Sequence, residues 1–312
     1  MKRSATYLLG VLLLLAAGSC SVQKKCKAPQ LDMPAEIVAG QSDTLTLSDR
    51  KWWEVYTDTT LCRLIGRTLD RNRNMLSAEA RIRQLEELYR VSKAARLPSL
   101  GGLAAADYET NDYYGEAHKG DAEFDVKATL SWEADLWGNL RWAKRKGGAE
   151  YLASVEDRRA MRMTLVASVA AAYFNLIALD NELSIVRRTL ITRSEGLYQV
   201  QLRFGGGLTS EMVYQQAKVE YASTAALIPD LERKIKIMEN GILLLMGENP
   251  DRRVVRGKMN TDAEFADSLP VGLPSGLLQR RPDVRSSEQR LRAAMASAGM
   301  AYADRFPRLT FN

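Results

Sequence analysis

Histidine and cysteine, the residues that most often bind transition metals, are scarce in this chain of 312 residues. The sequence contains one histidine, His118, and three cysteines, Cys20, Cys26 and Cys62. A zinc site needs three or four such side chains at a suitable spacing, and this sequence offers no such group. Carboxylate pairs occur, but no nucleophile or base accompanies them in an arrangement typical of an active site. The sequence therefore predicts neither an enzyme nor a protein that holds a metal or a cofactor.

Features typical of nucleic-acid and nucleotide binding are also missing. The formal net charge is +6, but basic and acidic residues are interleaved, as they are between Arg81 and Arg90, and no basic face carries aromatic residues among its charges. The glycines at 205–207 follow no strand pattern, and no lysine comes after them in the register of a phosphate-binding loop. Nucleic acid is therefore not a predicted partner, and the glycine run is not interpreted as a phosphate site.

The apolar run at residues 8–17 is too short to span a bilayer as a helix. It follows Lys2 and Arg3, so residues 1–19 have the layout of a signal peptide and predict export. The run ends in LAAGSC, which resembles a bacterial lipobox, and we expect lipid attachment at Cys20; a signal peptide with a cysteine there by chance is the alternative. Two acyl chains give stable anchoring. Because no aspartate follows Cys20, the expected destination is the outer membrane.

The next segment, residues 20–50, is polar and irregular and is interpreted as a lipidated tether. With Cys20 taken by lipid, Cys26 and Cys62 remain. Either these two form a disulfide in the oxidising envelope, or Cys62 stays a free thiol in an amphipathic helix.

Strict alternation of apolar and polar side chains marks residues 124–136 as a strand with two unlike faces. The run is longer than the roughly 9–11 residues that a tilted strand needs to cross a membrane. It predicts a membrane β-strand, with a half-buried strand of a soluble sheet as the alternative. The residues expected to meet lipid are Phe124, Val126, Leu130 and Trp132. The residues expected to line a water-filled lumen are Asp125, Lys127, Thr129, Ser131, Glu133 and Asp135.

A weaker strand pattern at 100–111 precedes this run, and a polar loop joins the two. Together they predict a β-hairpin at about 100–136, with His118 exposed at its tip. Trp132 and Trp137 lie near the base of the hairpin. They are interpreted either as part of an aromatic girdle at the membrane interface or as packing residues.

No proline occurs from Leu140 to Arg203, so a single long helix is predicted at about 140–203. At about 1.5 Å per residue it would reach on the order of 95 Å. A second helix is predicted at about 210–246, with a kink at Pro229. A seven-residue spacing of apolar side chains indicates that the helices pack side by side; these positions are Val169, Leu176, Leu183, Leu190, Leu197 and Phe204.

The turn between the two helices is predicted to be an exposed tip. Its glycines permit the chain to reverse, and Thr209 or Ser210 can cap the returning helix. We expect Gly207, Leu208, Thr209 and Ser210 to contact the helical hairpin of an adaptor protein; a loop without a partner is the alternative.

An internal repeat appears when the sequence is shifted by 209 positions, which places Pro307 over Pro98. The shift also aligns Glu288 with Glu79, Arg290 with Arg81, Leu291 with Ile82, Arg292 with Arg83, Arg305 with Arg96 and Leu309 with Leu100. We therefore divide the chain into a first repeat at 51–249, a crossover at 250–276 and the start of a second repeat at 277–312. The second repeat is expected to be cut off at its C-terminal end.

Three segments resemble a known family. Residues 273–285, LPSGLLQRRPDVR, with 288–291 resemble the signature of NodT-type lipoproteins among the TolC-like outer-membrane efflux factors. Residues 132–138, WEADLWG, resemble the end of that family's second strand, and residues 203–217 resemble its first periplasmic tip. The resemblance covers nearly all of residues 52–311.

The resemblance implies a mainly α fold with a membrane β-hairpin. Long antiparallel coiled-coil helices would form a tunnel, and strands from a homotrimer would form an outer-membrane β-barrel of twelve strands. A periplasmic adaptor and an inner-membrane pump of the resistance-nodulation-division (RND) class would be the partners, and the channel would be a passive conduit, lipid-anchored in the outer membrane and extending into the periplasm.

Three copies of this chain would supply only six complete strands. We therefore expect that the fragment does not close a barrel alone. The alternatives are a lipid-anchored periplasmic coiled-coil adaptor or structural protein, and a nonfunctional truncated remnant.

Overall fold

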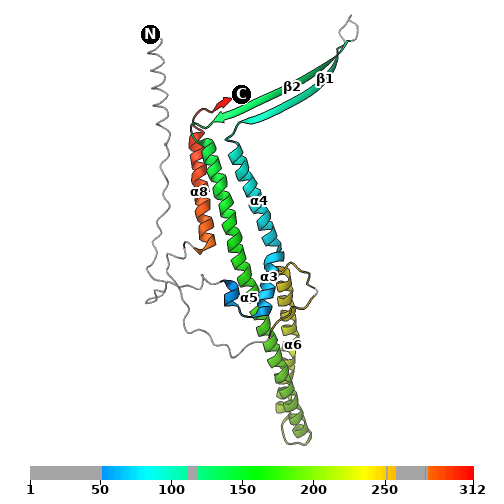
Figure 1. Cartoon of the computed structure of the whole chain (residues 1–312). Helices are drawn as coiled ribbons and strands as arrows, with labels where there is room; N and C mark the ends of the chain where they lie inside the picture. The colour runs from blue at the N-terminus through cyan, green and yellow to red at the C-terminus, as the bar shows by residue number, and fades with distance from the viewer. Residues whose placement is uncertain (1–50, 112–118, 251, 258–277, 279) are drawn as a thin grey trace, which may run out of the picture. The chain divides into compact units, whose positions relative to one another are not determined.

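The computed structural model describes residues 51–111, 119–250, 252–257, 278 and 280–312. The predicted signal peptide, Cys20, the tether, Cys26, His118 and most of the crossover lie outside these residues. The described chain is mainly helical with a long β-hairpin, which confirms the predicted fold class (Figure 1). Its elements are α2 (Trp52–Val55), α3 (Thr59–Arg71), α4 (Arg73–Ala94), β1 (Ser99–Asn111), β2 (Lys119–Ala134), α5 (Asn139–Gly205), α6 (Glu211–Leu245), α8 (Pro282–Ala303) and β3 (Leu309–Phe311).

The structure divides into two compact units. The hairpin unit contains the described residues of 80–157 and 282–312, and the helical unit contains those of 51–79 and 158–281. Each unit is described by itself below.

The hairpin unit contains one three-stranded antiparallel arrangement in the order β1–β2–β3. β1 pairs with β2 from Ser99 opposite Ser131 to the tip of the hairpin, and β3 pairs with the last three residues of β2. β2 begins at Lys119, five residues before the alternation predicts, and ends at Ala134, two residues before the predicted end. The amide of Leu136 donates to the carbonyl oxygen of Ala134 at 2.8 Å, so a turn follows the strand directly.

Small residues let the helices of the hairpin unit approach closely. A Cβ atom on Gly148 would lie 3.2 Å from the ring of Tyr89 of α4, and one on Gly299 of α8 would lie 2.5 Å from the ring of Trp142 of α5. The first turns of α5 therefore pack against both α4 and α8, as Figure 1 shows. α4 ends at Ala94 and α8 ends at Ala303, which are 209 positions apart, the same offset that relates the two sequence repeats.

The core of the helical unit lies between α3, α5 and α6. Its fully buried side chains include Leu61 and Ile65 of α3, Val169, Tyr173 and Leu176 of α5, and Ile242 of α6. The predicted long helix and its antiparallel return are confirmed as α5 and α6. Among the described residues, α5 is the one helix long and apolar enough to cross a membrane, and part of its apolar surface is buried in this core.

α6 continues through Pro229 as one helix and ends next to the junction of α3 and α4. Gly247 closes α6 with a positive φ of 69°, and a Cβ atom there would lie 2.6 Å from the carbonyl oxygen of Arg71. The side-chain Nδ2 of Asn72 donates to the carbonyl oxygen of Leu245 at 2.8 Å, while its Oδ1 accepts from the backbone amides of Asn74 and Met75 in the first turn of α4. The junction between α3 and α4 is thus a docking point for the end of α6.

Candidate functional site

The two faces of the hairpin differ in polarity along most of the paired length. Residues opposite each other in an antiparallel pair share a face, so the register decides which side chains meet. One face bears no charged side chain over ten paired residues: Leu100, Gly102, Ala104, Ala106 and Tyr108 of β1, and Ala122, Phe124, Val126, Ala128 and Leu130 of β2. Its larger side chains are open to the surroundings, with Val126 83% and Phe124 78% exposed. The alternation seen in β2 therefore extends across both strands.

The other face carries the charged and hydroxyl side chains of β2. Asp125, Lys127, Thr129 and Ser131 lie opposite Ala105, Leu103, Gly101 and Ser99, and Glu133 follows on the same face, opposite Thr310 of β3. Lys127 forms an ion pair with Asp125. Nearer the tip, Asp107 lies opposite Glu123. The predicted polar positions from Asp125 to Glu133 thus share one face, and their role as the wall of a lumen stays a prediction.

Asp135, which was predicted to face the lumen with these residues, lies outside the strand. β2 ends at Ala134, and the carboxylate of Asp135 accepts hydrogen bonds from the amides of Leu140 at 3.1 Å and Arg141 at 2.9 Å. These amides belong to the first turn of α5, where the helix leaves its N–H groups without partners and favours negative charge. Asp135 therefore caps α5 instead of continuing the strand. The sequence signal for this change of direction was the glycine at position 138. In the structure Gly138 has a positive φ of 81° in the turn that leads into α5.

Two tryptophans connect the base of the hairpin to segments distant in sequence. Trp132 stacks on Phe311 with ring centroids 5.9 Å apart, and its Nε1 donates to the carbonyl oxygen of Arg96 at 3.3 Å. Trp137 stacks on Phe306 at 4.6 Å. Both rings thus contact other segments of the chain, while Trp132 stays 41% and Trp137 44% exposed, so both interpretations stay predictions.

The tip between α5 and α6 is closed by hydrogen bonds that require a glycine. Gly207 has a φ of 71°; its amide donates to the carbonyl oxygen of Phe204 at 2.9 Å, and the amide of Leu208 donates to that of Arg203 at 2.8 Å. This is the pattern of a Schellman motif, in which a left-handed residue ends the helix. Ser210 occupies the N-cap position of α6, but its hydroxyl makes no capping hydrogen bond.

The surface of the tip is apolar. Leu208 is 74% exposed and Met212, which sequence reasoning missed, is 77% exposed. Phe204 stacks on Tyr214 with ring planes 9° apart, which joins the two helices just behind the turn. An exposed apolar end on a fixed helical pair is a surface that another helix can contact. The predicted adaptor contact at Gly207–Ser210 stays a prediction.

The described residues contain no group of three or more histidine, cysteine, aspartate or glutamate side chains placed to hold a metal ion. Cys62 is a free thiol that donates to the carbonyl oxygen of Tyr56 at 3.1 Å. Because Cys26 lies outside the described residues, the alternative of a disulfide is not addressed.

Comparison with known proteins places these features in a family. Residues 64–248 match the family described as outer membrane efflux protein. Outer membrane protein OprJ of Pseudomonas aeruginosa is 28% identical over 99% of this chain and 66% of its own length. Cation efflux system protein CusC of Escherichia coli O6:H1 is 28% identical over 98% of this chain and 67% of its own length.

Solved structures agree with the sequence relatives. The outer-membrane channel OprN superimposes with a TM-score of 0.78 and 27% identity, covering 93% of this chain and 66% of that one. A crystal structure of CusC gives a TM-score of 0.78 and 26% identity with the same coverage. The chain spans about two thirds of the length of the relatives it matches. Because the family match extends over more than half of its residues, the chain belongs to the outer membrane efflux protein family.

Proposed function

We propose that this chain is the outer-membrane channel component of a tripartite efflux system and acts as a passive conduit for small molecules. The observation that carries the proposal is the hairpin, in which an uncharged apolar face and a polar face lie back to back on two paired strands. A bilayer on one side and water on the other account for this division, since barrel strands alternate lipid-facing and lumen-facing residues. Such a conduit makes and breaks no bonds, so no catalytic group is required.

The hairpin needs further strands to be stable in a membrane. Backbone groups at a sheet edge find no water in hydrocarbon, so a membrane sheet must close on itself. Within the described residues the outer edge of β1 has no paired strand. In the proposed homotrimer, hairpins from three protomers contribute six strands to one barrel, and closing it requires further strands beside them.

The partners follow from the helical tip. The apolar turn formed by Gly207, Leu208, Thr209 and Ser210 would receive the helical hairpin of a periplasmic adaptor, which in turn would join an inner-membrane pump of the RND class. Leu208 supplies an exposed apolar side chain for this contact. The glycines before it keep the turn narrow and allow close approach of another helix.

The N-terminal residues would anchor the protein. Residues 1–19 would be removed as a signal peptide, and Cys20 would carry the lipid that holds the tether at the outer membrane. A relative from Salmonella typhimurium, 28% identical over 96% of this chain, is named a probable outer membrane lipoprotein, SilC. This likeness supports the lipid anchor.

The test introduces a charge on each face of the hairpin. The chain is produced with its adaptor and pump in a Gram-negative host that lacks its own efflux channels, and both outer-membrane insertion and dye extrusion are measured. A lysine in place of Val126 would face lipid at a cost of about 2–4 kcal/mol near the bilayer midplane. We expect Val126→Lys to abolish insertion, and with it any extrusion, and the matched change Asp125→Lys on the polar face to preserve insertion. Equal effects of the two changes, or a wild-type chain found in the soluble fraction, would contradict the proposal.

A further inference from the structure

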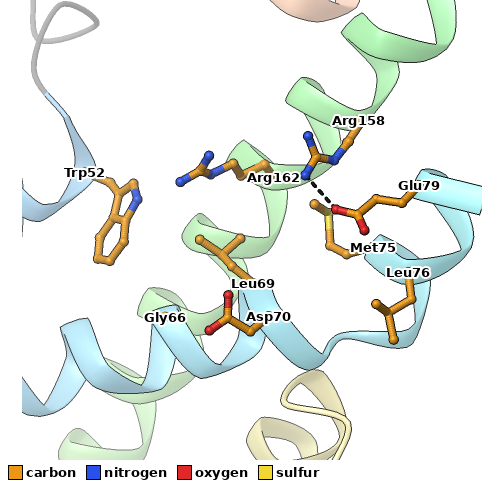
Figure 2. Close-up of a pocket in the computed structure, with 9 residues that line it drawn as sticks. All are labelled: Trp52, Gly66, Leu69, Asp70, Met75, Leu76, Glu79, Arg158 and Arg162. Atoms are coloured by element: carbon orange, nitrogen blue, oxygen red, sulfur yellow. Dashed lines mark hydrogen bonds and ion pairs between the residues drawn. The ribbon is translucent and has the colours of Figure 1, made fainter. Parts of the chain in front are cut away.

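A cleft of about 460 Å³ lies within the helical unit, between α2, α3, α4 and α5 (Figure 2). Its volume falls in the range of small-molecule sites, about 300–1,000 Å³. The cleft is lined by Trp52, Gly66, Leu69, Asp70, Met75, Leu76, Glu79, Arg158 and Arg162. It is separate from the hairpin and the tip, and the channel function gives it no role.

The cleft contains a buried hydrogen-bond donor without an acceptor. The Nε1 atom of Trp52 is buried and has no hydrogen-bond partner among the residues that the structure describes. An indole N–H can only donate, and a buried donor left without a partner is costly, so most such groups in native proteins are satisfied. An acceptor that enters the cleft would remove this cost.

A free cation lies next to this donor. Within the described part of the chain Arg162 makes no hydrogen bond or ion pair, whereas Arg158, one turn earlier on α5, is paired with Glu79 at 2.6 Å. Figure 2 shows the guanidinium group of Arg162 extending toward the side of the cleft where Trp52 lies. The cleft therefore has two donor side chains without partners among its lining residues, an indole N–H and a guanidinium, and both are suited to a negatively charged oxygen.

The rest of the cleft restricts the ligand further. Leu69, Met75 and Leu76 supply apolar surface, and the charge of Glu79 is already compensated by Arg158. Asp70 lies beside Leu69 in Figure 2, away from Trp52 and Arg162. One guanidinium balances one negative charge, which favours a ligand with a single negative charge and an apolar body.

We propose that this cleft binds a small monocarboxylate with an apolar body. Its carboxylate accepts hydrogen bonds from Nε1 of Trp52 and from the guanidinium of Arg162, which can hold both oxygens at once. Its apolar part lies against Leu69 and Met75. The proposal does not depend on the proposed channel function, because every residue it uses lies in the helical unit.

The first test uses the wild-type chain and two ligands of the same shape. 4-Fluorophenylacetate and the uncharged 4-fluorophenylacetamide are each titrated against the full chain in non-ionic detergent, with empty micelles as the blank, and binding is followed by fluorine NMR. Hydrogen bonds to a charged group are roughly twice as strong as neutral ones. We expect saturable binding of the carboxylate and at least about tenfold weaker binding of the amide. An absence of saturable binding, or equal affinity for both ligands, overturns the proposal.

The second test uses variants in matched pairs. Arg162→Gln is compared with Arg63→Gln, an exposed arginine of α3 outside the cleft, and Trp52→Phe is compared with Trp53→Phe. We expect Arg162→Gln to weaken carboxylate binding about tenfold or more and Trp52→Phe about fivefold, as the loss of charged and neutral hydrogen bonds requires, while both controls bind as the wild type does. Equal affinities of Arg162→Gln and Arg63→Gln overturn the proposal. If circular dichroism shows that Trp52→Phe is misfolded, the proposal is judged from the other two comparisons. These are Arg162→Gln with Arg63→Gln, and the carboxylate ligand with the amide ligand.

Discussion

The Nε1 atom of Trp137 donates a hydrogen bond of 2.9 Å to the carbonyl oxygen of Pro307, 170 residues later in the chain. The same indole stacks on Phe306, and the segment that follows Pro307 forms β3. A residue in the turn that follows β2 thus holds the segment that leads into β3. Because a slip of one residue would turn every side chain of a strand to the opposite face, this contact contributes to the register of β3.

Replacing Trp137 separates the hydrogen bond from the ring. Trp137→Phe keeps an aromatic ring but leaves the carbonyl of Pro307 without its donor, at an expected cost of about 0.5–1.5 kcal/mol. Trp137→Ala also removes the stack, so we expect a larger loss of about 2–3 kcal/mol. This loss is smaller than that for a fully buried tryptophan, because the side chain of Trp137 is only half-buried. Hydrogen exchange of the β3 amides measures the effect. Unchanged protection of β3 in both variants would show that its register is set elsewhere.

Gly299 is predicted to be required for the contact of α8 with α5. A methyl group there would lie 2.5 Å from the ring of Trp142, closer than van der Waals contact allows. We expect Gly299→Ala to destabilise the hairpin unit by about 1–3 kcal/mol. The matched control is Gly66→Ala in α3, where a methyl group would meet nothing within 4 Å, and which should be neutral or stabilising by up to about 1 kcal/mol. Thermal unfolding followed by circular dichroism distinguishes the two, and an equal effect of both changes would refute the steric argument.

Arg256 forms ion pairs with Asp180 of α5 and Glu239 of α6, and the Glu239 side chain is almost fully buried. Removing the arginine leaves the carboxylate of Glu239 buried without its main counter-charge. We expect Arg256→Gln to lower the free energy of unfolding by about 2–4 kcal/mol. The control Arg187→Gln breaks an exposed pair with Glu232 and should cost less than about 1 kcal/mol.

A double substitution tests whether the buried charge is the cause. In Arg256→Gln with Glu239→Gln, no charge remains to be desolvated at position 239, and the loss should be smaller than for Arg256→Gln alone. Denaturant unfolding provides the comparison. If the double variant loses as much as the sum of the two single variants, the cost arises from lost packing instead.

Asp58 is predicted to make the helical unit sensitive to acid. Burial raises the pKa of its carboxyl, but hydrogen bonds from the hydroxyl of Tyr173 and from the amides of Thr60 and Leu61 outweigh burial and lower the pKa below 3.8. A group whose pKa is lowered in the folded state stabilises the fold above its unfolded pKa of about 3.9. This contribution is therefore complete at neutral pH and is lost as the pH falls below about 4.

Tyr173→Phe tests this linkage. Without the hydroxyl the pKa of Asp58 should rise, so the free energy of unfolding should depend less on pH between about 4 and 2 than in the wild type. The same hydroxyl accepts from the amide of Gly257 at 3.0 Å, so we also expect a loss of about 1–3 kcal/mol at pH 7. Tyr198→Phe, an exposed position on the same helix, is the control. If the free energy of unfolding of Tyr173→Phe depends on pH between about 4 and 2 as that of the wild type does, the backbone amides alone set the pKa of Asp58.

Local patterns predicted the elements because their physical causes are local. A side-chain period of two appears in residues 124–134, and a seven-residue apolar spacing in a stretch without proline indicates a helix over 140–203. The turn at Gly207 was equally predictable, since a left-handed residue after a helix favours glycine. The family resemblance rested on motifs of the same kind, which are contiguous in the chain.

The pairings across long separations in sequence could not be predicted in this way. Asp135 continues the alternation of the strand, yet it caps α5 because the backbone turns after Ala134 and exposes two free amides to its carboxylate. Arg256 and Asp180, 76 residues apart, are both common surface residues whose partnership no spacing indicates.

The sequence by itself determined which stretches become strand, helix and turn and which face of each is apolar, because side-chain period and backbone permissiveness act over a few neighbouring residues. Only the tertiary structure decided which polar groups find partners. Packing brings Trp137 to Pro307 and, within the described residues, leaves the indole nitrogen of Trp52 and the guanidinium of Arg162 without partners. Whether a buried donor is satisfied depends on every element around it, and no local pattern of residues records that.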